Sequence, residues 1–110
     1  MEIASIYMTA PDHQTALDLS RTLVMERLVA CANVIPEITS VYTWEGELRQ
    51  DAEVAVLLKT QVAQATPAVE RIRQLHPYEC PCVLVFVSQA GNPEFFQWVA
   101  DSTRPLPRPE

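Results

Sequence analysis

Glycine is scarce in this 110-residue chain, which contains only Gly46 and Gly91. Phosphate-cradling loops need several closely spaced glycines, so the chain carries neither a P-loop nor a dinucleotide-binding fingerprint. The G-x-S-x-G and H-E-x-x-H patterns of hydrolases and zinc proteases are missing as well. No nucleophile–base pair is evident either. Together these absences favour a protein that is not an enzyme.

Positive charge is also in short supply. Eight Lys and Arg against fourteen Asp and Glu give a net charge of −6, with no basic cluster. This balance argues against nucleic acid and anionic membranes as partners. No apolar run reaches the ~18 residues of a membrane span, and the first residues lack the features of a signal peptide. Three cysteines without zinc-type pairing indicate a reducing compartment, and we expect the cytosol.

The residues that are present are organised around a long β-hairpin over residues 33–60. Apolar and polar side chains alternate over residues 34–44, which is the period of a strand, and Gly46 supplies the reversal. The return arm over residues 53–60 is apolar on both faces at its centre, as in an interior strand. Because strands usually run to ~5–6 residues, the first arm is long for this domain. We therefore expect it to pair with another chain.

Two helices and another strand are predicted around this hairpin. A strand over residues 3–8 comes first, and Asp12 then caps a helix that fades near Ala30. Thr66 and Pro67 are typical of the N-cap and first position of a second helix. The positions expected to face the core are Ala16, Leu17, Leu23, Val24 and Leu28 in the first helix and Val69, Ile72 and Leu75 in the second.

A fourth strand over residues 80–88 and a third helix over residues 93–102 complete the domain. The order β-α-β-β-α-β plus an extra helix predicts an α+β, ferredoxin-like fold with antiparallel strands in spatial order 4-1-3-2. We place this single domain at residues 1–103. The proline-rich tail over residues 104–110 is expected to be extended.

In that topology the end of the first strand lies beside the start of the fourth. Met8 and His76 would then approach Cys80 and Cys82, whose side chains face the same way in an extended segment. Thiolate, thioether and imidazole ligands select copper(I) or similar thiophilic metals, so this rim is a candidate metal site. The alternative is structural: two packed cysteines, a methionine in the core and a surface histidine.

Two further residues carry chemistry of their own. Cys31 is a lone thiol without a base beside it, and we interpret it as a packing residue rather than a nucleophile. Lys59 is the only lysine, and three roles remain open for it: reaching solvent at the strand end, pairing with Glu53, or binding an anionic ligand.

Five acids over residues 37–53 indicate a solvated hairpin tip, with weak hard-cation binding as the alternative.

Several short segments match a known family in order and spacing: residues 9–12, 28–33, 39–46, 59–60, 76–79, 91–92 and 98–99. Through them the chain resembles the CutA family of divalent-cation tolerance proteins over residues 3–103. The resemblance implies a ferredoxin-like homotrimer, similar in architecture to the PII signalling proteins, in which the long hairpins pair between subunits. It also implies copper binding, with the ligand positions at Met8 and His76.

This sequence departs from the family pattern where Met8 replaces a stronger cysteine ligand, and where Cys80 and Cys82 replace other residues. The resemblance further implies a polar inter-subunit cleft, whose residues here are Tyr42, Trp44, Glu53, Lys59, His76, Tyr78, Glu79 and Trp98. The expected function is a non-enzymatic trimer that binds copper or another soft divalent metal ion and contributes to the response to metal ions. The alternative is a PII-like sensor or scaffold that binds an anionic metabolite in the cleft.

Overall fold

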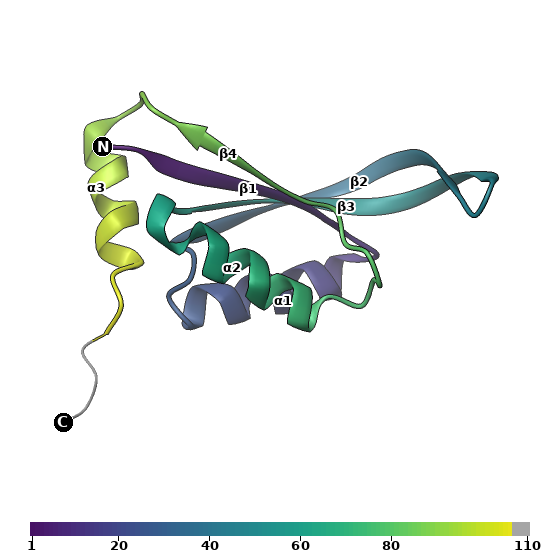
Figure 1. Cartoon of the computed structure of the whole chain (residues 1–110), viewed down its shortest axis with the longest axis horizontal. Helices are drawn as coiled ribbons and strands as arrows, with labels where there is room; N and C mark the ends of the chain where they lie inside the picture. Colours follow the sequence, from purple (N-terminus) through teal and green to yellow (C-terminus); the bar gives the residue numbers. More distant parts are fainter. Residues whose placement is uncertain (107–110) are drawn as a thin grey trace.

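The computed structural model describes residues 1–106, and the rest of the predicted tail lies outside this range. Four strands form one antiparallel sheet in the order β2-β3-β1-β4. Helices α1 and α2 lie together on one face of the sheet, and α3 lies beside one end of it (Figure 1). This confirms the predicted α+β, ferredoxin-like architecture and strand order. The elements are β1 (Ile3–Ala10), α1 (His13–Met25), β2 (Cys31–Trp44), β3 (Glu47–Gln61), α2 (Val62–Leu75), β4 (Val83–Ser88) and α3 (Pro93–Ser102).

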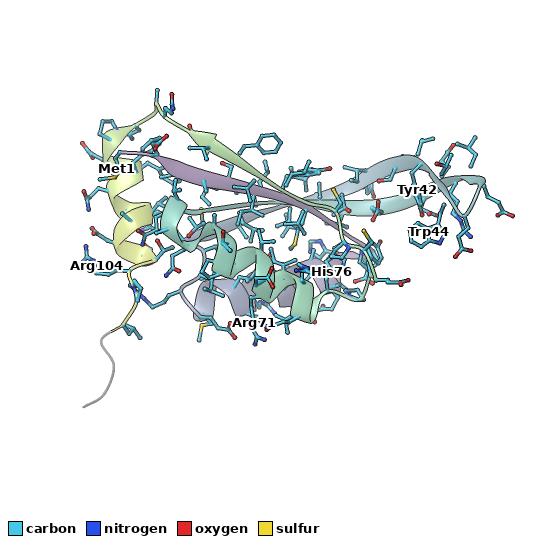
Figure 2. The ribbon with its side chains drawn as sticks, viewed as in Figure 1. Met1, Tyr42, Trp44, Arg71, His76 and Arg104 are labelled. Atoms are coloured by element: carbon cyan, nitrogen blue, oxygen red, sulfur yellow. The ribbon has the colours of Figure 1, made fainter. Side chains whose placement is uncertain are left out.

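The core lies between the sheet and the pair α1 and α2, where side chains from both fill the space (Figure 2). The fully buried Ile6, Val56 and Leu58 project from the sheet, and Leu23 and Ile72 meet them from the two helices. β1 pairs with β3 on one side and with β4 on the other, so it is one of the two interior strands of the sheet. None of the helices in residues 1–106 is long and apolar enough to span a membrane.

The first helix ends at Met25 rather than near Ala30, because Arg27 adopts a left-handed backbone with φ of 61°. Asp12 caps it as predicted, its side chain accepting a 2.7 Å hydrogen bond from the Thr15 amide. The predicted buried stripe was partly wrong, because Val24 is exposed, one position away from the buried Leu23. The buried residues of α1 are Ala16, Leu19, Ser20 and Leu23, the i, i+3, i+4, i+7 spacing of one helix face.

The second helix begins at Val62, directly after β3, and not at Pro67 as predicted. Pro67 lies inside the helix, where it removes one backbone hydrogen bond. Burial of Ala65, Ala68 and Ile72 on the core side offsets that loss. The inner face of α2 therefore uses these three residues, while Val69 is only half-buried and Leu75 is exposed.

The fourth strand is shorter than predicted, because it begins at Val83 rather than Cys80. Its first partner on β1 is Met8, opposite Val83. Pro81 has no amide hydrogen to donate to the ladder, which accounts for the late start. Cys80 and Cys82 therefore lie in the irregular segment between α2 and β4.

The face of the sheet opposite α1 and α2 is open, with no helix covering its centre (Figure 1). Alternation along the strands puts Leu84 and Phe86 of β4 on this face, opposite Tyr7 and Ser5 of β1. Phe86 is 57% exposed and Leu84 is 52% exposed. We call this surface, with the exposed Ile35 of β2, the open sheet face.

Candidate functional site

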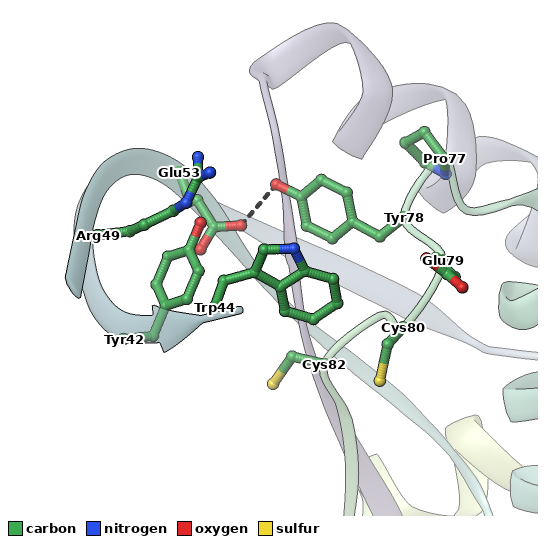
Figure 3. Close-up of a pocket in the computed structure, with 9 residues that line it drawn as sticks. All are labelled: Tyr42, Trp44, Arg49, Glu53, Pro77, Tyr78, Glu79, Cys80 and Cys82. Carbon is green, nitrogen blue, oxygen red and sulfur yellow. Dashed lines mark hydrogen bonds between the residues drawn. The ribbon is translucent and has the colours of Figure 1, made fainter. Parts of the chain in front are cut away.

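A pocket of about 520 Å³ lies between the β2–β3 hairpin and the segment that links α2 to β4. Figure 3 shows the hairpin side chains on one wall and the linking segment on the other. The pocket is lined by Tyr42, Trp44, Arg49, Glu53, Pro77, Tyr78, Glu79, Cys80 and Cys82.

The turn that joins β2 to β3 determines which residues lie on the hairpin wall of the pocket. Glu45 and Gly46, with φ values of 51° and 80°, link Trp44 to its partner Glu47. Positive φ at both central residues is typical of a type I′ turn, whose twist matches that of the strands. The register that follows places Tyr42 opposite Arg49. Tyr42 and Trp44 are two residues apart and therefore face the same side.

A β-bulge separates this outer hairpin from the rest of the sheet. The β2–β3 register shifts between Ile35 and Ile38, and Glu37 within the bulge has a left-handed φ of 59°. A bulge bends its strand and increases the local twist. Beyond it, Ile38 pairs with Glu53, the residue whose carboxylate reaches the opposite wall.

His76 fixes the linking segment to the end of β1. Its Nε2 donates a 2.8 Å hydrogen bond to the Thr9 carbonyl, and its Nδ1 accepts a 3.1 Å bond from the Tyr78 amide. A carbonyl can only accept and an amide can only donate, so these partners define the neutral tautomer with the proton on Nε2. The side chain is 7% exposed, and its ring centroid lies 4.7 Å from that of Tyr78. These contacts with His76 hold Tyr78 in place on the pocket wall.

The two tyrosines of the pocket both donate to carboxylates. The Tyr78 hydroxyl donates to Glu53 Oε2 at 2.7 Å, a bond that crosses the pocket (Figure 3). Tyr42 donates to the Asp51 carboxylate. Burial and then the Glu53 carboxylate raise the pKa of Tyr78, and the hydrogen bond to Asp51 raises that of Tyr42. Both phenols are therefore neutral at physiological pH.

Of the four predicted metal ligands, Cys80 and Cys82 line the pocket. Burial and then the nearby Glu53 and Cys80 raise the pKa of the Cys82 thiol. Met8 is fully buried in the core, and both ring nitrogens of His76 already have hydrogen-bond partners. Within residues 1–106, His, Cys, Asp and Glu form no group of three or more that could hold a metal ion. The two thiols are thus the members of the predicted set that lie on the pocket walls.

Five of the eight predicted cleft residues meet in the pocket of a single chain, whereas Lys59, His76 and Trp98 do not line it. Lys59 Nζ donates to Asn33 Oδ1, while Glu53 is bonded to Tyr78. Trp98 lies on α3, at the end of the molecule opposite the hairpin (Figure 1). The residues brought together are Tyr42, Trp44, Glu53, Tyr78 and Glu79.

The sequence interpretation missed Arg49 and Pro77 as pocket residues. The signal for Arg49 was available, because counting back from a two-residue turn at Gly46 places it opposite Tyr42. Cys31 is half-buried, and burial raises the pKa of its thiol, which is consistent with a packing residue.

Fold and pocket together define a class of small α+β proteins, in which a ferredoxin-like sheet carries an over-long hairpin with a pocket at its side. The family model described as "CutA1 divalent ion tolerance protein" matches residues 4–102. The chain belongs to this CutA family.

Individual relatives agree with this assignment. A protein CutA homolog from Xenopus laevis is 40% identical over 99 residues, which cover 90% of this chain and 66% of that protein. The divalent-cation tolerance protein CutA of Escherichia coli is also 40% identical over 99 residues, covering 90% of this chain and 88% of the relative. The crystal structure of CutA from Xylella fastidiosa superposes with a TM-score of 0.91 at 33% identity, covering 93% and 98% of the two chains. The chain thus spans less than two thirds of the Xenopus protein.

Proposed function

We propose that this chain is a non-enzymatic, trimeric protein of the divalent-cation tolerance type that binds copper or another soft metal ion and contributes to the response to metal ions. Family membership supports the link to divalent cations. The observation that carries the proposal is that Cys80 and Cys82 line one pocket and are both exposed. Two thiolates suffice for a soft ion such as copper(I), which favours sulfur ligands.

His76 and Met8 are the candidates for completing the coordination. For His76 to bind the metal, its hydrogen bond to Thr9 or to Tyr78 must break. This change is confined to one rim of the sheet. Recruiting Met8 requires the core to open, since its side chain is fully buried. We therefore expect His76 to contribute before Met8.

The homotrimer is supported by surfaces that one chain leaves uncovered. Leu84, Phe86 and Ile35 expose apolar surface on the open sheet face, and such patches mark interaction sites. The outer hairpin also projects beyond β1, since β1 pairs with β3 only as far as Val54. Its backbone edges are available to pair with a second copy. A cytoplasmic location follows from the same proposal, because the thiols must stay reduced to bind metal.

The direct test is titration of the reduced protein with copper(I), read out by competition with a chromogenic chelator. We expect the double variant Cys80→Ser/Cys82→Ser to lose affinity about ten-fold or more, because both soft donors are removed. Cys31→Ser is the matched control, since it removes a thiol outside the pocket, and it should bind as the parent does. Equal affinity in the parent and the double variant would contradict the proposal.

A second candidate is a PII-like sensor or scaffold that binds a small metabolite, proposed above as anionic. The pocket supports small-ligand binding, because its volume of about 520 Å³ suits a small molecule. Arg49 is the cationic side chain of the pocket, which it shares with two carboxylates, Glu53 on the hairpin and Glu79 on the linking segment. An anionic ligand would have to bind Arg49, so Arg49→Gln should abolish a ligand-induced rise in melting temperature.

A further inference from the structure

We propose that the pocket binds a small organic cation, a quaternary ammonium or alkylammonium group, against the rings of Tyr42, Trp44 and Tyr78. We call these three side chains, two from the hairpin and one from the linking segment that faces it, the aromatic wall. The proposal rests on the second candidate function above, small-ligand binding in this pocket. It reverses the expected charge of the ligand and does not involve the two thiols.

The first argument is charge. The ionisable side chains on the pocket walls, apart from the cysteines and tyrosines, are Glu53, Glu79 and Arg49, so carboxylates outnumber the cation. Asp51 adds a third carboxylate through its bond from Tyr42. Lys59, the lysine that an anionic ligand would have used, is bonded to Asn33 and does not line the pocket. The local field therefore favours a positive ligand, in a chain whose net charge is −6.

The second argument is the aromatic wall itself. Trp44 and Tyr42 are 44% and 40% exposed on the hairpin, so their rings are accessible rather than absorbed into a core. Figure 3 shows the rings of Tyr42, Trp44 and Tyr78 among the side chains that line the pocket, with Glu53 bonded to the Tyr78 hydroxyl. A cation within about 6 Å of a ring centroid is attracted by the π-face, and most strongly by that of tryptophan.

The third argument is rigidity. Tyr78 is held at three points: its hydroxyl donates to Glu53, its amide donates to His76, and its ring packs on the imidazole. The opposite wall is a paired hairpin with a tight turn. A wall fixed before binding loses little conformational freedom when a ligand enters. Because the phenols are neutral and their hydroxyls donate to Glu53 and Asp51, each ring offers a neutral π-system rather than a phenolate to the ligand.

The test uses the full chain with Trp98→Phe, so that Trp44 is the only indole. Trp98 lies on α3 and not on the pocket walls, so this change leaves the site intact. Choline is titrated in the presence of a metal chelator, and compared with its uncharged analogue, in which a quaternary carbon replaces the nitrogen. We expect saturable fluorescence changes with choline, and binding of the neutral analogue about ten-fold weaker, because it lacks the cation–π and charge attraction.

Matched variants then assign the site. Glu53→Gln keeps the size of the side chain and removes its charge, and we expect choline affinity to fall several-fold. Glu70→Gln removes a carboxylate that pairs with Arg73 on α2, outside the pocket, and should leave affinity unchanged. Circular dichroism melting confirms that each variant folds.

Equal affinity for choline and its neutral analogue, or no saturable binding of either, overturns the proposal. Tighter binding of acetate than of choline, lost in Arg49→Gln, overturns it in favour of an anion site. Choline is titrated with a metal chelator present, so a failed copper titration and a failed choline titration are distinguishable. If choline binding fails while Arg49→Gln removes another ligand's effect, the pocket function survives and only the charge of its ligand is wrong.

Discussion

At the scale of single residues, His76 illustrates how a side chain can be misread from sequence. A histidine beside two cysteines suggests a metal ligand, yet this one is buried and bonded through both ring nitrogens. One bond goes to Thr9, which is 67 residues away along the chain. That partner was not predictable from local sequence, because it depends on β1 ending beside the start of β4. The general juxtaposition was predictable from topology, and the hydrogen bonds were not.

Cys82 gives a prediction about pH. Its thiol has a raised pKa because it is partly buried and because Glu53 and Cys80 are near. A soft metal ion must displace the thiol proton, so its affinity should rise as pH increases from about 6 to about 9. Glu53→Gln removes one cause of the raised pKa and should move the whole affinity curve to lower pH.

The measurement is the apparent affinity for silver(I), a redox-stable substitute for copper(I), across that pH series. Cys80→Ser/Cys82→Ser serves as the control that removes the titrating site. An affinity that does not change with pH in the parent protein would show that Cys82 is not a ligand.

At the scale of elements, the hairpin was largely predictable and its bulge was not. Alternation over residues 34–44 and Gly46 predicted two arms and the reversal, and the structure confirms both. Glu37 occupies a left-handed backbone that glycine or asparagine usually signals, and the adjacent Pro36 fits an edge strand as well as a bulge, so the sequence did not single out the bulge. The predicted start of α2 was wrong although the local signal was strong. Pro67 is typical of a first helical position, but tertiary packing overrides that preference here.

Glu37→Gly should stabilise the protein, because glycine adopts the left-handed backbone without the steric cost borne by glutamate. We expect a gain of about 1 kcal/mol in the free energy of unfolding, measured by urea denaturation at one protein concentration. Glu47→Gly is the matched control, an exposed glutamate in the same hairpin whose φ is negative. It should lose about 0.5–1 kcal/mol. Similar losses in both variants would argue against strain at Glu37.

At the scale of the whole molecule, the sheet has one covered face and one open face. Strand order followed from the element order, because the ferredoxin-like plan leaves few alternatives. The sequence did not predict which exposed apolar residues face away from the helices. Alternation gives no answer for β4, because it is apolar at every position from Val83 to Val87. The register with β1 resolves this by assigning Leu84 and Phe86 to the open sheet face.

Phe86→Glu should convert the trimer to a monomer, because it puts a charge on an apolar face that we propose to be shared between copies. Val24→Glu is the matched control: it places the same charge at an exposed apolar residue of α1 and should leave the assembly unchanged. Light scattering should give three times the chain mass of 12.4 kDa for the parent and the control. A parent that scatters as a monomer would refute the trimer itself.

The interior position of β1 also affects how the chain folds while it is being synthesised. This strand is synthesised before its two neighbours, β3 and β4, and the second of them is complete only when Ser88 has been added. Until then the edge of β1 that pairs with β4 has no partner, and unpaired strand edges are prone to aggregate. Completion of the sheet is therefore expected to be a late event of synthesis rather than a gradual one, and shortening the chain before β4 should yield an insoluble product.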